Sequence, residues 1–279
     1  MKIAISAEST IDLPQNLLDE YEISIIPFQV LLGNDEYKDG EITPNDIFEF
    51  VKKHKILPKT SAINQVQYQE YFEELLKDNE AIIHFCLSSK LSSAYSNAVQ
   101  VAKNMKNVYV VDTKSLSTGI ALLAIFAREC VRNGDDAQVA YEKALKKVDK
   151  VQASFVVDKL DYLRKGGRCS ALAYLGANIL GIHPEIVLID GFMKSGKKYK
   201  GKMERVVNDY CHDVLESNSQ PNLDIAFLTY TTATDEMRDI AIKYLKDRGF
   251  KQIYQTNAGA TITSHCGEKT LGILFLNEK

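Results

Sequence analysis

Residues 81–102 read AIIHFCLSSKLSSAYSNAVQVA, and this stretch decides the fold class. Residues 81–87 have the length and the mainly apolar composition of a buried strand, in which His84 is interpreted as a core residue. The serine-rich residues 88–93 form a loop, and apolar residues then recur with helical spacing from Tyr95 onward. A buried strand that leads through a polar loop into an amphipathic helix is the building unit of an α/β sheet.

The same alternation extends along the chain in both directions. Strands are predicted at Ile3–Ile5, Ile23–Leu32, Ala81–Leu87, Val108–Val111, Ala153–Val157, Glu185–Ile189, Ile225–Tyr230, Gln252–Tyr254 and Gly272–Leu276. Asp190-Gly191 predicts a tight hairpin turn in the second half, which reads as more mixed. We predict an α/β fold with a mainly parallel sheet in an N-terminal α/β domain, residues 1–150, and a mixed sheet in a C-terminal α/β domain, residues 151–279.

The composition is that of an ordinary globular protein, and a chain of 279 residues is long enough for two packed units. A net charge of −3 gives no basic excess, so we expect no nucleic-acid partner. The five cysteines are odd in number and form no CxxC pair, which argues against a disulfide framework and a zinc site. The N-terminus reads as a strand rather than a signal peptide, and the longest apolar run, 119–127, is shorter than the ~20 residues of a membrane span. We therefore expect a cytoplasmic protein.

Hydroxyl or acidic groups follow three of the predicted strands, at residues 6–10, 88–93 and 112–115. Ligands of open α/β sheets bind beyond the carboxyl ends of the strands. Ser92 and Ser93 stand where a helix begins, and hydroxyls combined with unpaired helix N–H groups make an anion site. The alternative is that one of these serines only caps the helix. Thr60-Ser61 likewise precedes a predicted helix, and alone it fits ordinary turn chemistry.

Basic segments offer further candidates in the second half. Residues 162–168, Tyr-Leu-Arg-Lys-Gly-Gly-Arg, place two glycines among cations, as expected of a backbone that turns beside an anion or of a basic surface loop leading to a helix at Leu172–Leu180. Lysines 194–202 fit a solvated hairpin or a docking patch. Residues 191–198 are not a P-loop, because Lys198 stands where Ser or Thr is needed. Residues 265–268, His-Cys-Gly-Glu, read as a polar turn and argue against a Cys–His catalytic pair.

The ordered set of motifs resembles the DegV family of fatty-acid-binding proteins over essentially the whole chain. The motifs are Thr60-Ser61, residues 87–92 (Leu-Ser-Ser-Lys-Leu-Ser), residues 111–115, residues 162–168, His183-Pro184, residues 189–191, residues 265–267 and Leu271-Gly272. The resemblance implies two α/β lobes of the DegV type with one fatty acid between them. It implies no cofactor other than this bound ligand.

The resemblance also assigns roles to residues. It implies that the carboxylate meets Thr60 and Ser92, next to Ser61 and Ser93, and that a loop with Arg164, Gly166, Gly167 and Arg168 lies near the ligand. Characterised members work with a dihydroxyacetone-kinase-like partner that uses ATP to form an acyl phosphate, and the partner-facing matches here are Lys200 and His265. The protein is then a carrier, not an enzyme, and we expect a monomer that allows peripheral membrane contact.

Several positions depart from the family pattern, including Ala62, Ser93, Lys200 and Glu268. Lys200 replaces an Arg and so loses bidentate phosphate geometry. These departures leave open an alternative, a binding module for another small apolar anion without kinase coupling. A third hypothesis, an enzyme that acts alone through His265 or Cys266, is the least favoured.

Overall fold

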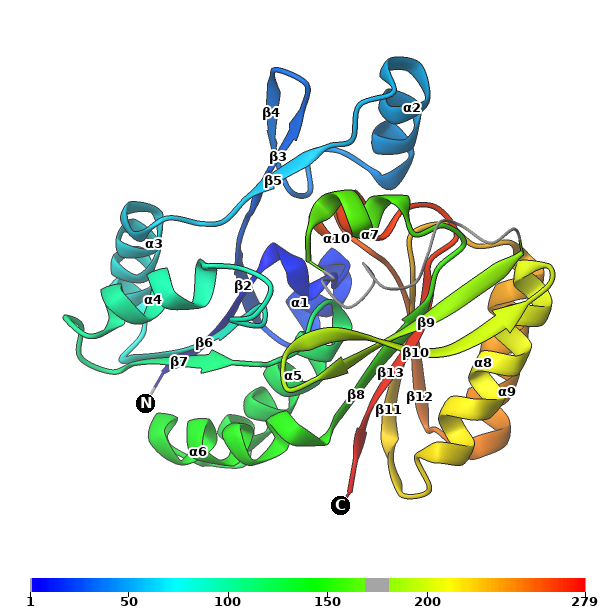
Figure 1. Ribbon diagram of the computed structural model, residues 1–279. Helices are drawn as coiled ribbons and strands as arrows, with labels where there is room; N and C mark the ends of the chain where they lie inside the picture. Colours follow the sequence, from blue (N-terminus) through cyan, green and yellow to red (C-terminus); the bar gives the residue numbers. More distant parts are fainter. Residues whose placement is uncertain (1, 169–180, 279) are drawn as a thin grey trace.

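The computed structural model describes residues 2–168 and 181–278, which form two large sheets and one small sheet (Figure 1). The first large sheet is fully parallel, with the strand order β2-β1-β6-β7. Its strands are β1 (Ile3–Glu8), β2 (Ile23–Ile26), β6 (Ala81–Cys86) and β7 (Val108–Asp112). One face is covered by α3 (Gln65–Asp78) and α4 (Ala94–Ala102), and the other by α5 (Thr118–Arg132) and α6 (Ala137–Lys147). The predicted parallel sheet is confirmed.

The second large sheet is mixed, as predicted, with the strand order β10-β9-β8-β13-β11-β12. Its strands are β8 (Val151–Val156), β9 (Ile182–Ile189), β10 (Phe192–Lys200), β11 (Pro221–Tyr230), β12 (Gln252–Asn257) and β13 (Leu271–Asn277). Only β11 and β12 pair in parallel among these described strands. The helices α8 (Met203–Ser217) and α9 (Asp235–Arg248) cover its outer face (Figure 1).

Helix α5 lies between the two large sheets, because it contacts β1 and β6 of the first and β8, β11 and β13 of the second. Eleven of its 15 residues are buried, as expected for a helix that is apolar nearly all round. The long apolar run at residues 119–127 is therefore the centre of a core helix. Among the described residues, no helix is long and apolar enough to cross a membrane.

The predicted single strand Ile23–Leu32 is wrong in one respect, because the segment forms two strands in different sheets. The first part is β2, and the second, β3 (Gln29–Leu32), joins a small antiparallel sheet with β4 (Asp35–Lys38) and β5 (Lys59–Ser61). Pro27 separates them, since proline has no N–H to donate to a ladder. The next N–H, that of Phe28, is bonded by the Ser9 hydroxyl oxygen at 3.0 Å. Helix α2 (Pro44–His54) packs beside this sheet in Figure 1.

Short helices complete the described part of the fold. They are η1 (Ser9–Ile11), α1 (Gln15–Glu20), η2 (Val148–Lys150), α7 (Asp161–Gly166) and α10 (Ala260–Cys266). The predicted polar turn at residues 265–268 is wrong in its first half, because His265 and Cys266 end α10, which packs against α7, while Glu268 lies in a turn. Its Thr- and Ile-containing sequence has weak helix propensity, and the contacts that hold its start come from distant segments described below. The predicted helix Leu172–Leu180 lies outside the described residues.

The hairpin between β9 and β10 is confirmed. Asp190 and Gly191 both have positive φ, 52° and 82°, as the favoured two-residue turn requires. All strands of the parallel sheet precede residue 113, and all strands of the mixed sheet follow residue 150. The division into domains 1–150 and 151–279 stays a prediction, since one continuous apolar core contains residues from both sheets.

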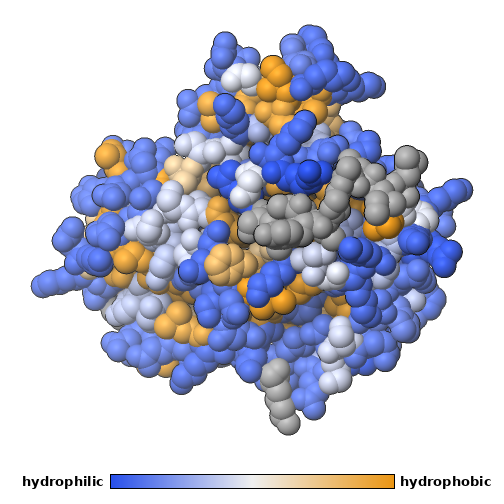
Figure 2. Space-filling model, viewed as in Figure 1, coloured by the Kyte–Doolittle hydropathy of each residue, from blue (hydrophilic) through white to orange (hydrophobic). Residues whose placement is uncertain are grey.

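Among the described residues, the large exposed apolar side chains are mostly scattered, although Ile189 and Phe192 pair across the β9–β10 hairpin. The large ones are Ile25, Ile56, Val66, Val139, Leu145, Ile189 and Phe192. Figure 2 likewise shows hydrophobic residues in small groups among hydrophilic ones on the face that it presents. Single exposed apolar residues are normal, so the space for an apolar ligand has to be sought inside the molecule.

Candidate ligand-binding site

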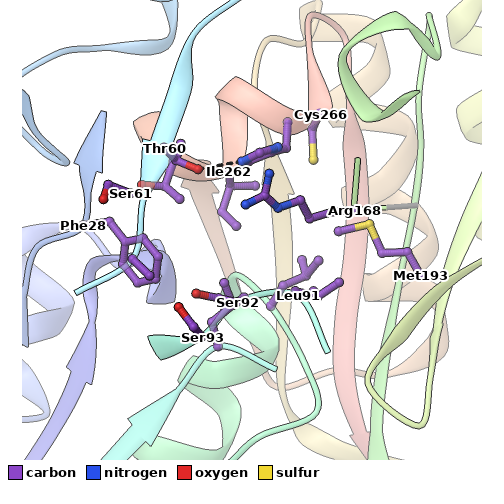
Figure 3. Close-up of a pocket in the computed structure, with 15 residues that line it drawn as sticks. Phe28, Thr60, Ser61, Leu91, Ser92, Ser93, Arg168, Met193, Ile262 and Cys266 are labelled. Atoms are coloured by element: carbon purple, nitrogen blue, oxygen red, sulfur yellow. Dashed lines mark hydrogen bonds between the residues drawn. The ribbon is translucent and has the colours of Figure 1, made fainter. Parts of the chain in front are cut away.

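A cavity of about 230 Å³ lies where the small sheet, the loop after β6, α10 and the start of β10 meet (Figure 3). The loop after β6 stands at the carboxyl end of a parallel strand, where α/β folds place ligands. The lining residues are Phe28, Thr60, Ser61, Ala62, Leu87, Leu91, Ser92, Ser93, Leu116, Arg168, Met193, Thr261, Ile262, His265 and Cys266. The structure thus brings together six of the predicted site residues from four distant segments.

Thr60 and His265 form a polar contact within the wall of this cavity. They are 205 residues apart in sequence, and Thr60 Oγ1 lies 2.8 Å from His265 Nε2. Burial, aided by the charge of Arg168, lowers the pKa of His265 to about 4, so the imidazole is neutral at pH 7. His265 Nδ1 is buried with no hydrogen-bond partner among the described residues.

The tautomer follows from this pairing. A buried N–H without an acceptor is rarer than a buried acceptor without a donor. We therefore assign the proton to Nε2, which donates to Thr60 Oγ1. The hydroxyl hydrogen of Thr60 is then left to donate to a ligand in the cavity.

Ser92 makes a helix-start contact and also lines the cavity, and its ligand role stays a prediction. Its hydroxyl oxygen accepts the Ala94 N–H at 3.1 Å at the start of α4, and the same side chain lines the cavity. An accepting hydroxyl still has its own hydrogen to donate. Ser93 is the residue that precedes α4, yet its side chain makes no capping bond there. Figure 3 shows the Ser61 hydroxyl directed away from Thr60, so Ser61 contributes to the wall rather than to that contact.

The basic segment meets the cavity at one residue, Arg168. Its guanidinium is directed into the cavity in Figure 3, and its Nη1 donates to the Gly166 carbonyl at 2.7 Å. Close packing requires glycine at position 166, because a Cβ there would lie 2.5 Å from His265 Nδ1. Gly167 ends α7 with a left-handed φ of 70°. Arg164 is exposed on α7 and does not line the cavity.

Lys200 lies apart from the predicted site residues that line the cavity. It ends β10, is exposed, and is absent from the cavity wall. His265, predicted beside it as a partner-facing residue, instead lines the cavity at Thr60. The two are therefore not one patch, and any common role must link the cavity to the surface.

The apolar part of the wall was missed from the sequence, because its members are ordinary core residues spread along the chain. Phe28, Leu116, Met193 and Ile262 are examples. A second, smaller cavity of about 30 Å³ shares Leu116, Ile262 and Cys266 with the first. It continues between α5 and the mixed sheet, against Phe155 and Leu274.

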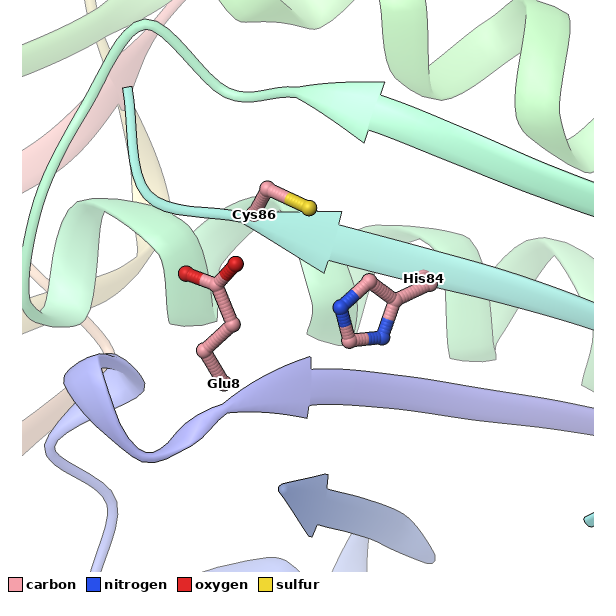
Figure 4. A group of neighbouring side chains, drawn as sticks. All are labelled: Glu8, His84 and Cys86. Atoms are coloured by element: carbon pink, nitrogen blue, oxygen red, sulfur yellow. The ribbon is translucent and has the colours of Figure 1, made fainter. Parts of the chain in front are cut away.

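A buried polar cluster of Glu8, His84 and Cys86 lies at the ends of β1 and β6, next to the loop that follows β6 (Figure 4). Glu8 Oε2 accepts the Leu87 N–H at 2.7 Å, and Glu8 Oε1 accepts the Tyr68 hydroxyl at 2.6 Å. Desolvation raises the pKa of Glu8 to about 7 despite these bonds, and burial lowers the pKa of His84 to about 3. His84 is a core residue, as predicted.

Glu8, His84 and Cys86 are also close enough to share a metal ion, with ligand atoms all within 4.8 Å of one another. Both Glu8 oxygens are already engaged, and His84 Nδ1 pairs with Ser6 Oγ at 2.6 Å. His84 Nε2 is buried with no hydrogen-bond partner among the described residues. Because both Glu8 oxygens already accept hydrogen bonds, one of them from the Leu87 N–H, we assign the cluster to holding Leu87 in place.

The fold and the cavity define a class of protein, a two-sheet α/β binding protein whose cavity wall combines hydroxyl groups with apolar side chains. The chain belongs to the DegV family, since a family model described as "Uncharacterised protein, DegV family" matches residues 2–278. The expected family membership is confirmed.

Individual relatives agree over their whole length. A protein of Thermotoga maritima named "Fatty acid-binding protein" is 29% identical, over 98% of this chain and 96% of its own. The crystal structure of DegV from Bacillus subtilis, described as a fatty acid binding protein, is similar with a TM-score of 0.86 at 27% identity and full coverage of both chains. A DegV family protein from Thermus thermophilus has a TM-score of 0.91 at 24% identity, over 99% of this chain and 100% of its own, which bears on the fold.

Proposed function

We propose that this protein binds a long-chain fatty acid, with the carboxylate at the hydroxyl-lined end of the cavity and the acyl chain along its apolar wall. The observation that carries the proposal is the cavity whose wall combines Thr60, backed by His265, and Ser92 with apolar side chains. Two relatives above 25% identity, from Thermotoga maritima and Bacillus subtilis, are themselves described as fatty-acid-binding proteins.

The polar end suits a carboxylate. Thr60 and Ser92 each have a hydroxyl hydrogen to donate, and Arg168 brings a positive charge into the same cavity. Hydrogen bonds to a charged group contribute about 1.5–3 kcal/mol each. Because His265 is neutral, it orients Thr60 without adding a second charge.

The apolar wall suits an acyl chain. Each buried CH₂ contributes about 0.8 kcal/mol before ordering costs, so the tail supplies most of the affinity. The two cavities share the wall residues Leu116, Ile262 and Cys266. An acyl chain that pushes these side chains apart would extend from the first cavity into the second, toward the mixed sheet.

The first test is native mass spectrometry of protein purified from a bacterial host, followed by identification of what denaturation releases. We expect a mass excess of one fatty acid per chain. A bare polypeptide mass, combined with no stabilisation by any added fatty acid, would contradict the proposal.

We further propose that the protein is a non-catalytic carrier in the cytoplasm, a monomer that allows peripheral membrane contact and presents the carboxylate to a dihydroxyacetone-kinase-like partner. In that step a carboxylate oxygen attacks the γ-phosphorus of ATP on the partner, and ADP leaves, which yields an acyl phosphate. Lys200 is exposed outside the cavity, as a partner-facing residue has to be.

One observation favours the alternative, a binding module for another small apolar anion without a kinase. Ser93 adds a side chain to the cavity wall beside Ser92, where it narrows the space for a carboxylate with a long tail. Reconstitution of the protein with the kinase of its own organism, ATP and a fatty acid separates the two. Acyl phosphate formation supports the carrier function and excludes the module, whereas no acyl phosphate formation contradicts the kinase coupling.

A further inference from the structure

The start of α10 is held by two acids from the N-terminal part of the chain. Asp12 Oδ1 accepts the Gly259 N–H at 2.8 Å, and Asp39 Oδ1 accepts the Ala260 N–H at 2.7 Å. These acids are 247 and 221 residues away in sequence, whereas the capped helices α2, α3, α6 and α9 use a residue of their own segment. Helix α10 is therefore fastened to another part of the fold at the place where its free N–H groups begin.

The second oxygen of each acid extends this junction. Asp12 Oδ2 accepts the hydroxyl of Ser117 just before α5, and Asp39 Oδ2 accepts the hydroxyl of Ser9 at 3.0 Å. The Ser9 oxygen in turn accepts the N–H of Phe28, a cavity residue. One connected set of hydrogen bonds thus joins α10 to the segment that supplies the facing wall.

The junction is closely packed. Asp12 and Asp39 are 5% and 7% exposed, and both Oδ1 atoms lie 3.0 Å from the point that a Cβ at Gly259 would occupy. Two buried acids so close together are unfavourable unless donors surround them. Here each acid has one backbone N–H of α10 and one serine hydroxyl.

Helix α10 carries Thr261, Ile262, His265 and Cys266 into the cavity. We propose that Asp12 and Asp39 are positioning residues of the ligand site, which hold α10 against the N-terminal part of the chain so that His265 meets Thr60. When fatty-acid affinity is the measured quantity, this positioning role rests on the proposed function. It goes beyond that function in naming the groups that set the geometry of the site.

The test compares Asp39→Ala with Asp136→Ala. Asp136 is exposed and accepts the Val139 N–H at 2.9 Å at the start of α6, which supplies no cavity residue. Both variants remove one helix cap, and Asp39→Ala also leaves the buried Ser9 hydroxyl without its acceptor, so it should lose more stability than Asp136→Ala. We expect hexadecanoate to bind Asp39→Ala about fivefold to tenfold more weakly, and Asp136→Ala with wild-type affinity. Asp39→Asn, which keeps one acceptor oxygen, should restore most of the affinity.

The second readout is the ¹⁵N chemical shift of the His265 ring in ligand-free protein. We expect it to change in Asp39→Ala and to stay unchanged in Asp136→Ala, because only the first releases α10. If Asp39→Ala does not fold, Ser9→Ala is measured against Ser217→Ala, an exposed serine of α8, with the same expectations and about threefold weaker binding.

A folded Asp39→Ala variant, or the Ser9→Ala substitute for it, with wild-type affinity and an unchanged His265 shift overturns the positioning role. Failure of the wild-type protein to bind any fatty acid overturns the proposed function instead. In that case the His265 shift alone decides the positioning role.

Discussion

At the scale of residues, the site depends on hydroxyl groups whose hydrogens are directed by their neighbours. His265 holds Thr60 from behind, and the Ala94 N–H occupies an acceptor position on Ser92. In each case the protein satisfies the oxygen as an acceptor and leaves the hydrogen for a ligand. Two neutral hydroxyls prepared in this way can bind a carboxylate beside Arg168, which is exposed, so no second buried charge has to be desolvated.

The Ser92→Ala substitution tests this arrangement. We expect fatty-acid binding to weaken by about 1–3 kcal/mol, because a hydrogen bond to a charged group is lost. Isothermal titration with a soluble fatty acid measures the change. Thr234→Ala is the matched control, since Thr234 caps α9 by the same kind of bond, 3.2 Å from the Met237 N–H, far from the cavity wall. Equal affinity in the two variants would remove Ser92 from the carboxylate site.

Glu8 gives a prediction about pH. Its pKa is raised by burial from 4.5 to about 7, so between these values the folded protein retains a proton that the unfolded chain has lost. The free energy of unfolding therefore falls as pH rises through this window, by up to about 3 kcal/mol. In Glu8→Gln this component is absent.

Urea denaturation at intervals from pH 4.5 to 7.5 measures the difference between wild type and Glu8→Gln. Glu36→Gln, which changes an exposed acid on β4, is the control and should keep the wild-type slope. A Glu8→Gln protein with the same pH slope as wild type would show that Glu8 is ionised in the fold.

At the scale of elements, α10 is a short helix whose position is set by others. Its start is held by Asp12 and Asp39, and its end is packed against α7 at Gly166. Isolated helices of this length are not stable in water, so the contacts decide both its existence and its direction. The same contacts therefore set the shape of the part of the cavity wall that α10 supplies.

The Gly166→Ala substitution separates packing from helix propensity. Propensity alone predicts a gain of up to about 1 kcal/mol, because alanine favours a helix over glycine. The structure predicts the opposite, a loss of about 1–3 kcal/mol and weaker ligand binding, since the new Cβ would lie 2.5 Å from His265 Nδ1. Thermal unfolding and titration measure both, with Lys165→Ala on exposed α7 surface as the control. A Gly166→Ala protein that is more stable than wild type would show that His265 can move aside at no cost in stability.

At the scale of the whole molecule, the cavity belongs to the junction of the sheets rather than to either one. The β9–β10 turn also reaches the loop after β6, where Ser88 Oγ donates to the Gly191 carbonyl at 2.8 Å and Lys90 lies 5.4 Å from the centre of the Phe192 ring. A ligand between these parts contacts both and therefore stabilises their association.

Ligand removal tests this coupling. We expect protein stripped of lipid to unfold at a lower temperature, and added hexadecanoate at 100 times its Kd to restore about 2.7 kcal/mol. Differential scanning calorimetry of stripped and reloaded protein measures the effect. An unchanged unfolding temperature across that concentration range would contradict binding to the folded state.

The sequence by itself determined the class of fold and most strands and helices of the large sheets. Apolar runs such as residues 81–87 and faces such as those of α5 and α8 report burial directly, because their period follows from local geometry. Pro27 also shows how a local signal can be overlooked, since it alone marks the end of β2. Thr60, Ser61, Ser92 and Ser93 were found through the order of motifs, and their ligand role stays a prediction.

Only the tertiary structure decided how the site is assembled. The contact of Thr60 with His265 and the hold of Asp12 and Asp39 on α10 each join segments more than 200 residues apart. No local pattern records such pairs, because each partner alone reads as an ordinary turn or cap residue. Helix α10 itself has weak propensity and takes its stability from those distant acceptors. The periodicity of a chain shows which faces are buried, whereas which buried groups meet is set by packing of the whole molecule.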